Sequence, residues 1–199
     1  VYFVNDNIWT LDGDGELRLT IMATMAQEES RKISERSLAG QRVSREKGVL
    51  YGNGNIFGYT RNKLTKQFEI DPDQAETVKM IFDLYMETDS LTAVEAELLR
   101  QRIKTKQGKD FTRFAIKAIL QNPVYMVADQ EAYDYLTEKE ADLFSDRAEF
   151  DGKHGIMAYN RTDQEKGKTT QYNPVNEWIV AVGKHPGLIP GKTWVRVQE

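Results

Sequence analysis

The sequence predicts an α+β protein that is mainly helical, in which a long connecting helix leads into a helix-turn-helix-like unit and a small β-containing C-terminal part. Three observations predict this class. Residues 15–47 contain no proline and a single internal glycine, Gly40. Three shorter segments between residues 72 and 123 repeat apolar residues at helical spacing. Alternating apolar and polar residues, typical of strands, occur mainly after residue 150.

The long helix follows a short strand and a turn. We expect Val1–Val4 to form the strand and Asp12–Gly15 the turn, with Asp14 as N-cap of the helix. An apolar stripe at helical spacing then comprises Leu17, Ile21, Met22, Met25, Ala26 and Ile33. Gly48 ends the helix. At about 1.5 Å per residue it would be about 50 Å long, which exceeds most helices of single domains.

The charged residues are arranged in blocks along the chain, although the net charge is −4. Residues 31–66 carry nine Lys and Arg against two acids, and residues 100–118 carry seven against one. Residues 67–99 and 129–151 carry nine acids each. Either basic block alone is most simply a solvated face. Two such blocks on one small chain favour a phosphate-binding surface.

A glycine-rich connector separates the long helix from the rest of the chain. Residues 48–58 contain four glycines and two asparagines, with apolar anchors at Tyr51, Ile56, Phe57 and Tyr59. We therefore predict a first domain at 1–48, a linker at 49–59 and a second domain at 60–199. The segment from Gly52 to Tyr59 could follow a DNA minor groove or act as a plain hinge.

Three short helices are predicted between residues 71 and 123. Asp71-Pro72-Asp73 begins the first, Ser90 caps the second, which ends near Ile103, and Thr112 caps the third, which Pro123 ends. The residues expected inside are Val78, Ile81, Phe82, Tyr85, Leu91, Val94, Leu98, Ala115, Ile116, Ile119 and Leu120. This spacing predicts a compact trihelical unit.

The remaining residues predict an acidic helix, two strands and a last helix. The acidic helix covers 129–144, with Tyr133, Leu136 and Leu143 inward. Residues 154–159 and 178–182 alternate like strands, and residues 187–192 turn into the final helix. DNA would repel the acidic stretch 129–151, which we expect to face away from it, toward another subunit.

Composition excludes several kinds of site. The chain has no cysteine, and His154 and His185 are far apart in sequence, so we expect no metal. No phosphate-cradling glycine motif is present, and no cofactor is expected. No apolar run reaches the 18 or so residues of a membrane span, and Val1–Val4 lacks the features of a signal peptide. We expect a cytoplasmic protein without a membrane partner.

The trihelical unit resembles a helix-turn-helix, whose last helix reads the DNA major groove. Arg113 and Lys117 lie opposite Ile116 and Ile119, with Phe114 nearby, which suits this role. Solvent-facing charges on an amphipathic helix would show the same spacing. The basic residues of the preceding turn, Arg100, Arg102, Lys104 and Lys106, favour the DNA-binding alternative.

Several motifs in order resemble the serine recombinase family. Residues 25–36 read MAQEESRKISER and are followed by Gly40 and Gly48, which is similar to the AQxExxxIxER…G segment of the serine recombinase catalytic domain. Asn7–Thr10 resembles the segment before that helix. Ile56–Tyr59 is similar to the PFGY that opens the recombinase domain of large serine recombinases, with Ile56 replacing proline. Residues 119–125 (ILQNPVY) also fit, whereas Asp89 replaces a common glycine. The tail, residues 178–182 and 185–197, resembles the end of the same domain more weakly.

The resemblance implies a site-specific recombinase that cuts and rejoins double-stranded DNA of a phage or transposon through serine-phosphate intermediates. Its partners would be DNA attachment or transposon-end sites and a second copy of the chain, with a tetramer when two sites meet. In the family, the nucleophile precedes the long helix. We expect this chain to be a piece of a longer protein that lacks the nucleophile and therefore does not itself cut DNA. Ser30, Ser34, Ser37 and Ser44 lack a base partner and are interpreted as ordinary helix residues.

The resemblance also gives roles to residues of the long helix and the linker. Leu17, Ile21, Met22 and Met25 resemble the apolar surface through which two helices pair, although burial within one subunit is the alternative. Phosphate contacts are implied for Arg36, Arg42, Arg45 and Lys47, with Glu35 restraining Arg36. The remaining predicted DNA-binding residues are Tyr59, Arg61, Lys63, Arg100, Arg102, Lys104, Lys106, Thr112, Arg113 and Lys117.

Two other classes of protein share these features. A transcription regulator could dimerise two helix-turn-helix domains through the long helix, and its DNA target would be palindromic. An interaction scaffold could use the long helix alone, and it would show no salt-sensitive DNA binding.

Overall fold

The computed structural model describes residues 2–3, 8–9, 17, 20–32, 40, 43, 56–62, 64, 67–163 and 171–199. The chain divides into two compact units, Val1–Val43 and Ser44–Glu199. Several predictions lie outside the described residues. They are the cap at Asp14, the roles of Glu35, Arg36, Arg42, Arg45, Lys47 and Lys63, the helix end at Gly48, and the linker up to Asn55.

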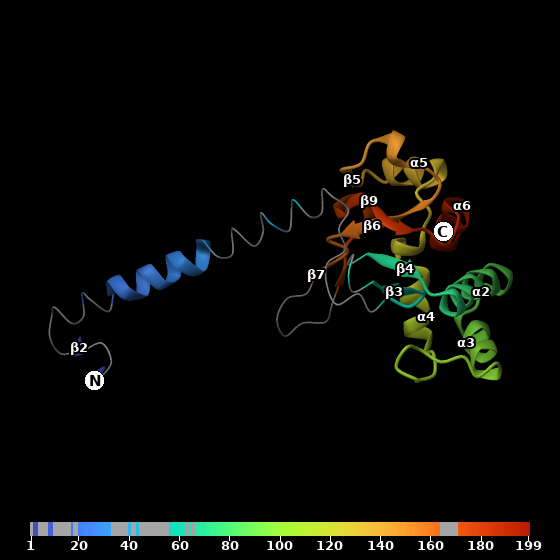
Figure 1. Cartoon of the computed structure of the whole chain (residues 1–199), viewed down its shortest axis with the longest axis horizontal. Helices are drawn as coiled ribbons and strands as arrows, with labels where there is room; N and C mark the ends of the chain where they lie inside the picture. The colour runs from blue at the N-terminus through green and yellow to red at the C-terminus, as the bar shows by residue number, and fades with distance from the viewer. Residues whose placement is uncertain are drawn as a thin grey trace. The chain divides into compact units, whose positions relative to one another are not determined.

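The first unit contains a small hairpin and helical residues. Strand β1 (Tyr2–Phe3) pairs antiparallel with β2 (Ile8–Trp9). Residues 20–32 are helical and are drawn as the blue ribbon of Figure 1, and residues 17, 40 and 43 are helical as well. On this helix Arg31 pairs with Glu28 at 2.7 Å. The helix prediction is confirmed over these described residues.

The second unit begins with a hairpin of β3 (Tyr59–Arg61) and β4 (Phe68–Ile70), followed by three helices. Helix α2 (Pro72–Thr88) has Asp71 as N-cap, α3 (Leu91–Arg100) has Ser90, and α4 (Arg113–Leu120) has Thr112. Each cap side chain accepts a hydrogen bond from a backbone N–H of the first turn, as predicted. The three helices pack against one another through Val78, Ile81, Phe82, Val94, Leu98 and Ile116, all of which are buried. The trihelical unit is therefore confirmed.

The connection between α3 and α4 differs from the turn of a helix-turn-helix. It runs from Gln101 to Thr112, whereas that motif uses about three to four residues. Lys104 and Asp110 face each other as an antiparallel bridge, and Thr105 and Lys109 add hydrogen bonds. Gly108 has a φ of 72°, which a residue without a side chain adopts without strain. The connection is a hairpin-like loop, hereafter the 101–112 loop.

The C-terminal part is a three-stranded mixed sheet with helices. Strand β9 (Ile179–Pro186) lies between β6 (His154–Tyr159), which is antiparallel to it, and β5 (Asp142–Leu143), which is parallel. Helix α5 (Gln130–Glu138) and helix α6 (Gly191–Gln198) pack together, and α6 also contacts α2 and α4. Strands β7 (Thr162–Asp163) and β8 (Gln171–Tyr172) form a small hairpin. Short 3-10 turns occupy Pro123–Tyr125, Arg147–Glu149 and Val175–Glu177.

Two of the C-terminal predictions need correction in their boundaries. The acidic helix ends at Glu138 rather than at Phe144, because Glu140 adopts a positive φ of 56° and the chain then enters β5. The predicted strand 178–182 begins at Ile179 and continues to Pro186. Leu136 is buried as predicted, while Tyr133 and Leu143 are only partly buried. The strand at 154–159 and the last helix are confirmed.

One core joins the helices to the sheet. Tyr59 stacks on Tyr125 at 6.0 Å between ring centroids and meets the edge of His185 at 5.4 Å. The His185 ring nitrogen Nε2 lies 2.8 Å from the carbonyl oxygen of Val124. Burial lowers the pKa of His185, so the ring is neutral and its Nε2–H donates to that carbonyl. No helix in the described part of the chain is long and apolar enough to cross a membrane.

Candidate nucleic-acid interface

Helix α4 presents a basic and aromatic face above a buried one. Ile116, Ile119 and Leu120 are buried against the core, which fixes the rotation of the helix. On the outer face Arg113 and Lys117 are exposed, and Phe114 has 75% of its surface accessible. A large exposed aromatic side chain between two cations is unusual for a merely solvated helix face.

Arg113 lies beside a carboxylate from the neighbouring helix. Its Nε atom is 3.6 Å from Oε2 of Glu95 on α3, and its backbone N–H donates to Oε1 of Glu95 at 3.2 Å. The backbone contact satisfies a free donor of the first helical turn. Both side chains are accessible to solvent, so a phosphate or a base could compete for the guanidinium.

Further cations surround α4 and are paired in the same way. Arg100 at the end of α3 forms an ion pair with Glu97, whose pKa falls to about 2 through hydrogen bonds from Arg100 and Gln101. Lys104 pairs with Asp110 across the 101–112 loop. Arg102 is exposed and adopts a positive φ of 58°. The end of α3 and the 101–112 loop thus carry these predicted basic residues, and the ion pairs of Arg100 and Lys104 are open to solvent.

Lys106, which is also predicted to contact DNA, makes two hydrogen bonds within the fold. Its ammonium group donates to the carbonyl oxygen of Ile56 at 2.6 Å and to that of Tyr59. Burial lowers the pKa of this lysine, with Asp71 acting in the opposite direction. The ammonium fastens the 101–112 loop to the segment that enters the domain, and its contact with DNA stays a prediction.

The prediction for Tyr59 is contradicted by its burial. The side chain has no accessible surface, and its hydroxyl donates to the carbonyl oxygen of Pro186 at 2.7 Å. Desolvation raises the pKa of the hydroxyl far above its usual value. Tyr59 therefore belongs to the core, while its strand neighbour Arg61 is exposed.

The residues predicted to pair two subunits lie on the surface of the first unit. Leu17, Ile21, Met22 and Met25 have between 46% and 67% of their surface accessible. Four large apolar side chains on one helix face form an apolar patch without cover in the described part of that unit. The patch is compatible with the predicted contact surface.

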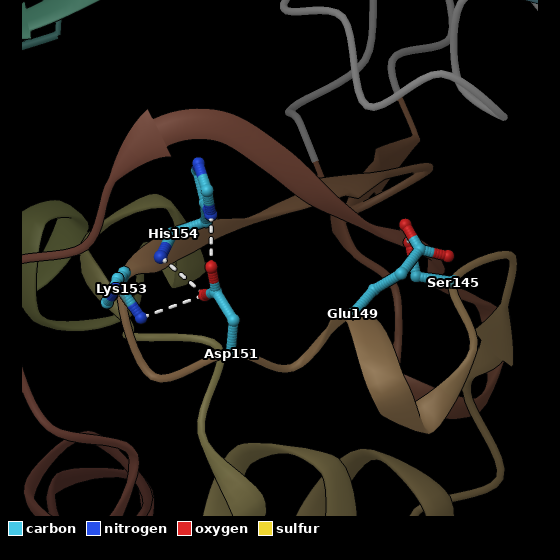
Figure 2. Close-up of polar contacts among 5 residues, drawn as sticks. All are labelled: Ser145, Glu149, Asp151, Lys153 and His154. Carbon is cyan, nitrogen blue, oxygen red and sulfur yellow. Dashed lines mark hydrogen bonds and ion pairs between the residues drawn. The ribbon is translucent and has the colours of Figure 1, made fainter.

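A second polar cluster lies at the start of β6, as Figure 2 shows. Asp151 accepts hydrogen bonds from the backbone N–H groups of His154 and Lys153, and its Oδ2 is 2.7 Å from Nδ1 of His154. These contacts, the backbone bond from His154 first, lower the pKa of Asp151 to about 2. In Figure 2 Ser145 and Glu149 lie apart from this pair.

The cluster does not form a catalytic triad. The Ser145 hydroxyl donates to Glu149 at 3.3 Å and accepts from the backbone of Val182 at 3.0 Å, so its partners belong to the fold rather than to His154. The cavity beside this cluster has a volume of about 410 Å³ and is lined in part by Ser145, Glu149, Asp151 and His154. No group of three or more potential metal ligands occurs among the described residues.

Sequence reasoning missed Arg161, which follows β6 and is partly buried. The guanidinium lies 5.5 Å from the ring of Trp178 and donates to Oδ1 of Asn122 and to the carbonyl oxygen of Gln121. These partners are about forty residues away in sequence, so no local pattern indicated the contact. The exposure of Phe114 is likewise a tertiary property, although its helix position placed it near Arg113.

Two families match the chain. The family described as Recombinase matches residues 72–199, and the one described as Resolvase, N terminal domain, matches residues 1–50. A curated protein of Bacillus subtilis (strain 168), named "Putative DNA recombinase", is 27% identical over 131 residues. That alignment covers 63% of this chain and 26% of the relative.

Two solved structures are also similar over 82% of the chain, each at 18% identity. One is the crystal structure of an LSR-DNA complex, with a TM-score of 0.47 and 36% of that chain covered. The other concerns the sequence requirements of the Listeria innocua prophage attP site, with a TM-score of 0.48 and 49% covered. The chain therefore spans less than half the length of each of these relatives.

The family assignment follows from the two family matches, which together cover nearly the whole chain in the order that the motifs predicted. With a resolvase-type segment at residues 1–50 and a Recombinase domain at residues 72–199, this chain belongs to the large serine recombinase family.

Proposed function

We propose that this chain is a DNA-binding part of a site-specific serine recombinase, with α4 lying in the major groove of the target. The observation that carries the proposal is the outer face of α4, where Arg113, Phe114 and Lys117 project from a helix whose other face is locked in the core. An arginine can donate to both acceptors of a guanine edge, and an apolar group can contact a thymine methyl.

The cations near α4 would hold the DNA backbone and set the register of the helix. Phosphate contacts are proposed for Arg61, Arg100, Arg102 and Lys104, with the hydroxyl of Thr112 beside them. Each exposed ion pair with Glu95, Glu97 or Asp110 is weak enough for a phosphate to replace it. The helix-turn-helix likeness is then one of function, because the 101–112 loop replaces the short turn.

The acidic segment 129–151 is proposed to face away from the DNA. Figure 1 shows α5 at one end of the second unit and the 101–112 loop at the other. In the opposite orientation the carboxylates of segment 129–151 would lie against phosphates. The repulsion would grow with the number of carboxylates. Chemical footprinting should therefore leave residues 129–146 unprotected.

The first unit is proposed to pair two subunits and to guide the DNA. Leu17, Ile21, Met22 and Met25 would form a helix-helix contact in a homodimer, with a tetramer when two sites are brought together. Arg36, Arg42, Arg45, Lys47 and Lys63 would contact phosphates. The whole protein would exchange DNA strands through a serine nucleophile. The serines of the long helix are proposed as ordinary helix residues, so this chain should not nick supercoiled DNA.

Selection from a random duplex pool, followed by salt titration, tests the proposal. We expect one enriched sequence that binds at least about 4 kcal/mol more tightly than scrambled duplex. Arg113→Ala should reduce this preference by about 1–3 kcal/mol, whereas Arg36→Ala should weaken both duplexes alike. Lys139→Ala on the acidic side is the matched control. The proposal fails if no sequence is enriched and binding does not depend on salt.

A further inference from the structure

Arg161 has a partly buried positive charge without an acidic partner in the described part of the chain. Its Nη1 donates to Asn122 Oδ1 at 2.8 Å and its Nη2 to the Gln121 carbonyl oxygen at 3.0 Å, and both partners are neutral. Its Nε atom is buried and has no hydrogen-bond partner among the described residues. Desolvation lowers the pKa of the guanidinium, which only the hydroxyls of Tyr172 and Tyr125 offset in part.

Such a charge is energetically costly for the fold alone. A cation taken out of water is normally compensated by a carboxylate or a bound anion, because neutral hydrogen-bond acceptors return only part of the hydration energy. Stacking on the ring of Trp178 contributes a smaller attraction. The unbalanced charge therefore points to an anion supplied from outside.

The guanidinium lines a cavity that could hold one. The cavity has a volume of about 430 Å³, and its polar lining residues are Gln121, Asn122, Asn160, Arg161, Thr162 and Tyr172. No described lining residue carries a carboxylate. Each terminal nitrogen of an arginine bears two hydrogens, and the contacts to Gln121 and Asn122 use one on each. A hydrogen on each terminal nitrogen is left for a ligand in the cavity.

The position of the cavity relates it to α4. Ala118 and Gln121 belong to its lining, and both follow Phe114 and Lys117 at helical spacing along the outer face of that helix. The eight residues of α4 extend about 12 Å, which is about the width of the major groove of B-DNA. If the groove holds the N-terminal end of α4, a DNA backbone would lie near the C-terminal end of the helix.

We propose that Arg161 and this cavity bind one backbone phosphate of the DNA at the C-terminal end of α4. This inference rests on the proposed function, since it requires α4 to lie in the groove. It adds a positioning contact outside the two basic blocks of the sequence. The phosphate would fix how deeply and at what angle the end of α4 enters, while Arg113 reads bases at the other end.

Two variants of the full chain test the proposal. Arg161→Gln removes the charge, and Thr162→Glu places a carboxylate at an exposed position of the cavity lining. Thr137→Glu on α5 has the same change in net charge at an exposed site far along the chain and serves as the control. Circular dichroism establishes that each variant is folded, and fluorescence anisotropy with selected and scrambled duplexes gives the affinity between about 50 and 200 mM KCl.

The expected result is the loss of one phosphate contact. For Thr162→Glu, and for Arg161→Gln if it folds, the slope of log affinity against log salt should be smaller by about 0.9 than for the native chain. The ratio of native to variant affinity should therefore be about 3.5-fold smaller at about 200 mM KCl than at about 50 mM KCl. This holds for both duplexes. Thr137→Glu should keep the native slope.

Two results overturn the proposal, and they are distinguishable. If the native chain binds DNA with salt dependence but Thr162→Glu behaves like Thr137→Glu, Arg161 only supports the fold and the proposed function survives. If the native chain does not bind duplex DNA at all, the proposed function itself fails, and this inference fails with it.

Discussion

Replacing Glu95 by glutamine should strengthen DNA binding and slightly weaken the fold. The carboxylate lies 3.6 Å from Arg113 Nε, so the guanidinium must leave it before it can bind a base or a phosphate. Two unit charges at that distance attract each other by about 1 kcal/mol in a water-like dielectric. Exposed pairs measured in other proteins give about 0.2–1 kcal/mol.

The expected gain in affinity follows from this range. Releasing Arg113 should increase affinity for DNA by up to about fivefold, and removal of a carboxylate near the phosphates adds to the effect. The glutamine side chain of the Glu95→Gln variant keeps an oxygen that can accept the Arg113 backbone N–H, which the native carboxylate holds at 3.2 Å. The fold loses only the favourable effect of a negative charge at the start of α4, about 0.3–1 kcal/mol. The expected decrease in Tm is about 1–4 °C.

The assay compares Glu95→Gln with Glu138→Gln, an exposed glutamate of α5 that gives the same change in net charge. Fluorescence anisotropy with the selected duplex measures affinity at constant salt, and a thermal melt measures stability. The reasoning is refuted if both variants gain affinity equally, because the effect would then be one of overall charge. It is also refuted if Glu95→Gln binds more weakly than the native chain.

Four further predictions concern single residues. Phe114→Ala should lower the preference for the selected duplex by about 1 kcal/mol with an unchanged Tm, because this ring is exposed; a drop in Tm would argue against the assignment. Gly155→Ala should destabilise the fold by about 1–3 kcal/mol in a thermal melt, since a methyl group there would overlap the His185 ring and approach the Val124 carbonyl oxygen to 2.9 Å. The pKa of His185 is lowered in the fold, so protonation favours the unfolded chain, and stability should fall as the pH drops below about 6.5; a His185→Gln variant should lack this slope. Met25→Lys should shift a dimer toward monomer in light scattering and leave the Tm of the second unit unchanged, and a dimer that persists would place the contact elsewhere.

Local signals predicted the helices well. Asp71, Ser90 and Thr112 cap α2, α3 and α4 as expected, because capping depends on residues within one turn of each other. The buried faces of these helices followed from spacing for the same reason. The acidic helix was predicted too long, and other contacts escaped prediction because the partners are distant in sequence.

Tyr59 and Lys106 illustrate such distant contacts. Tyr59 donates to Pro186, 127 residues away, and Lys106 donates to backbone oxygens 47 and 50 residues away. A count of charges and aromatics could not separate them from surface residues. Arg161 was missed because a single arginine after a strand carries no pattern, and its meaning depends on which charged groups lie near it in space.

The attachment of Lys106 has a mechanical consequence for the second unit. Its ammonium joins the 101–112 loop to the carbonyl oxygens of Ile56 and Tyr59, and the Tyr125 hydroxyl donates to that of Phe57 at 2.8 Å. A force on the chain ahead of Ile56 would therefore act, through Lys106, on the loop that leads directly into α4. In the proposed complex with DNA, a torque on the entering chain would be transmitted to α4 rather than absorbed at the domain entrance.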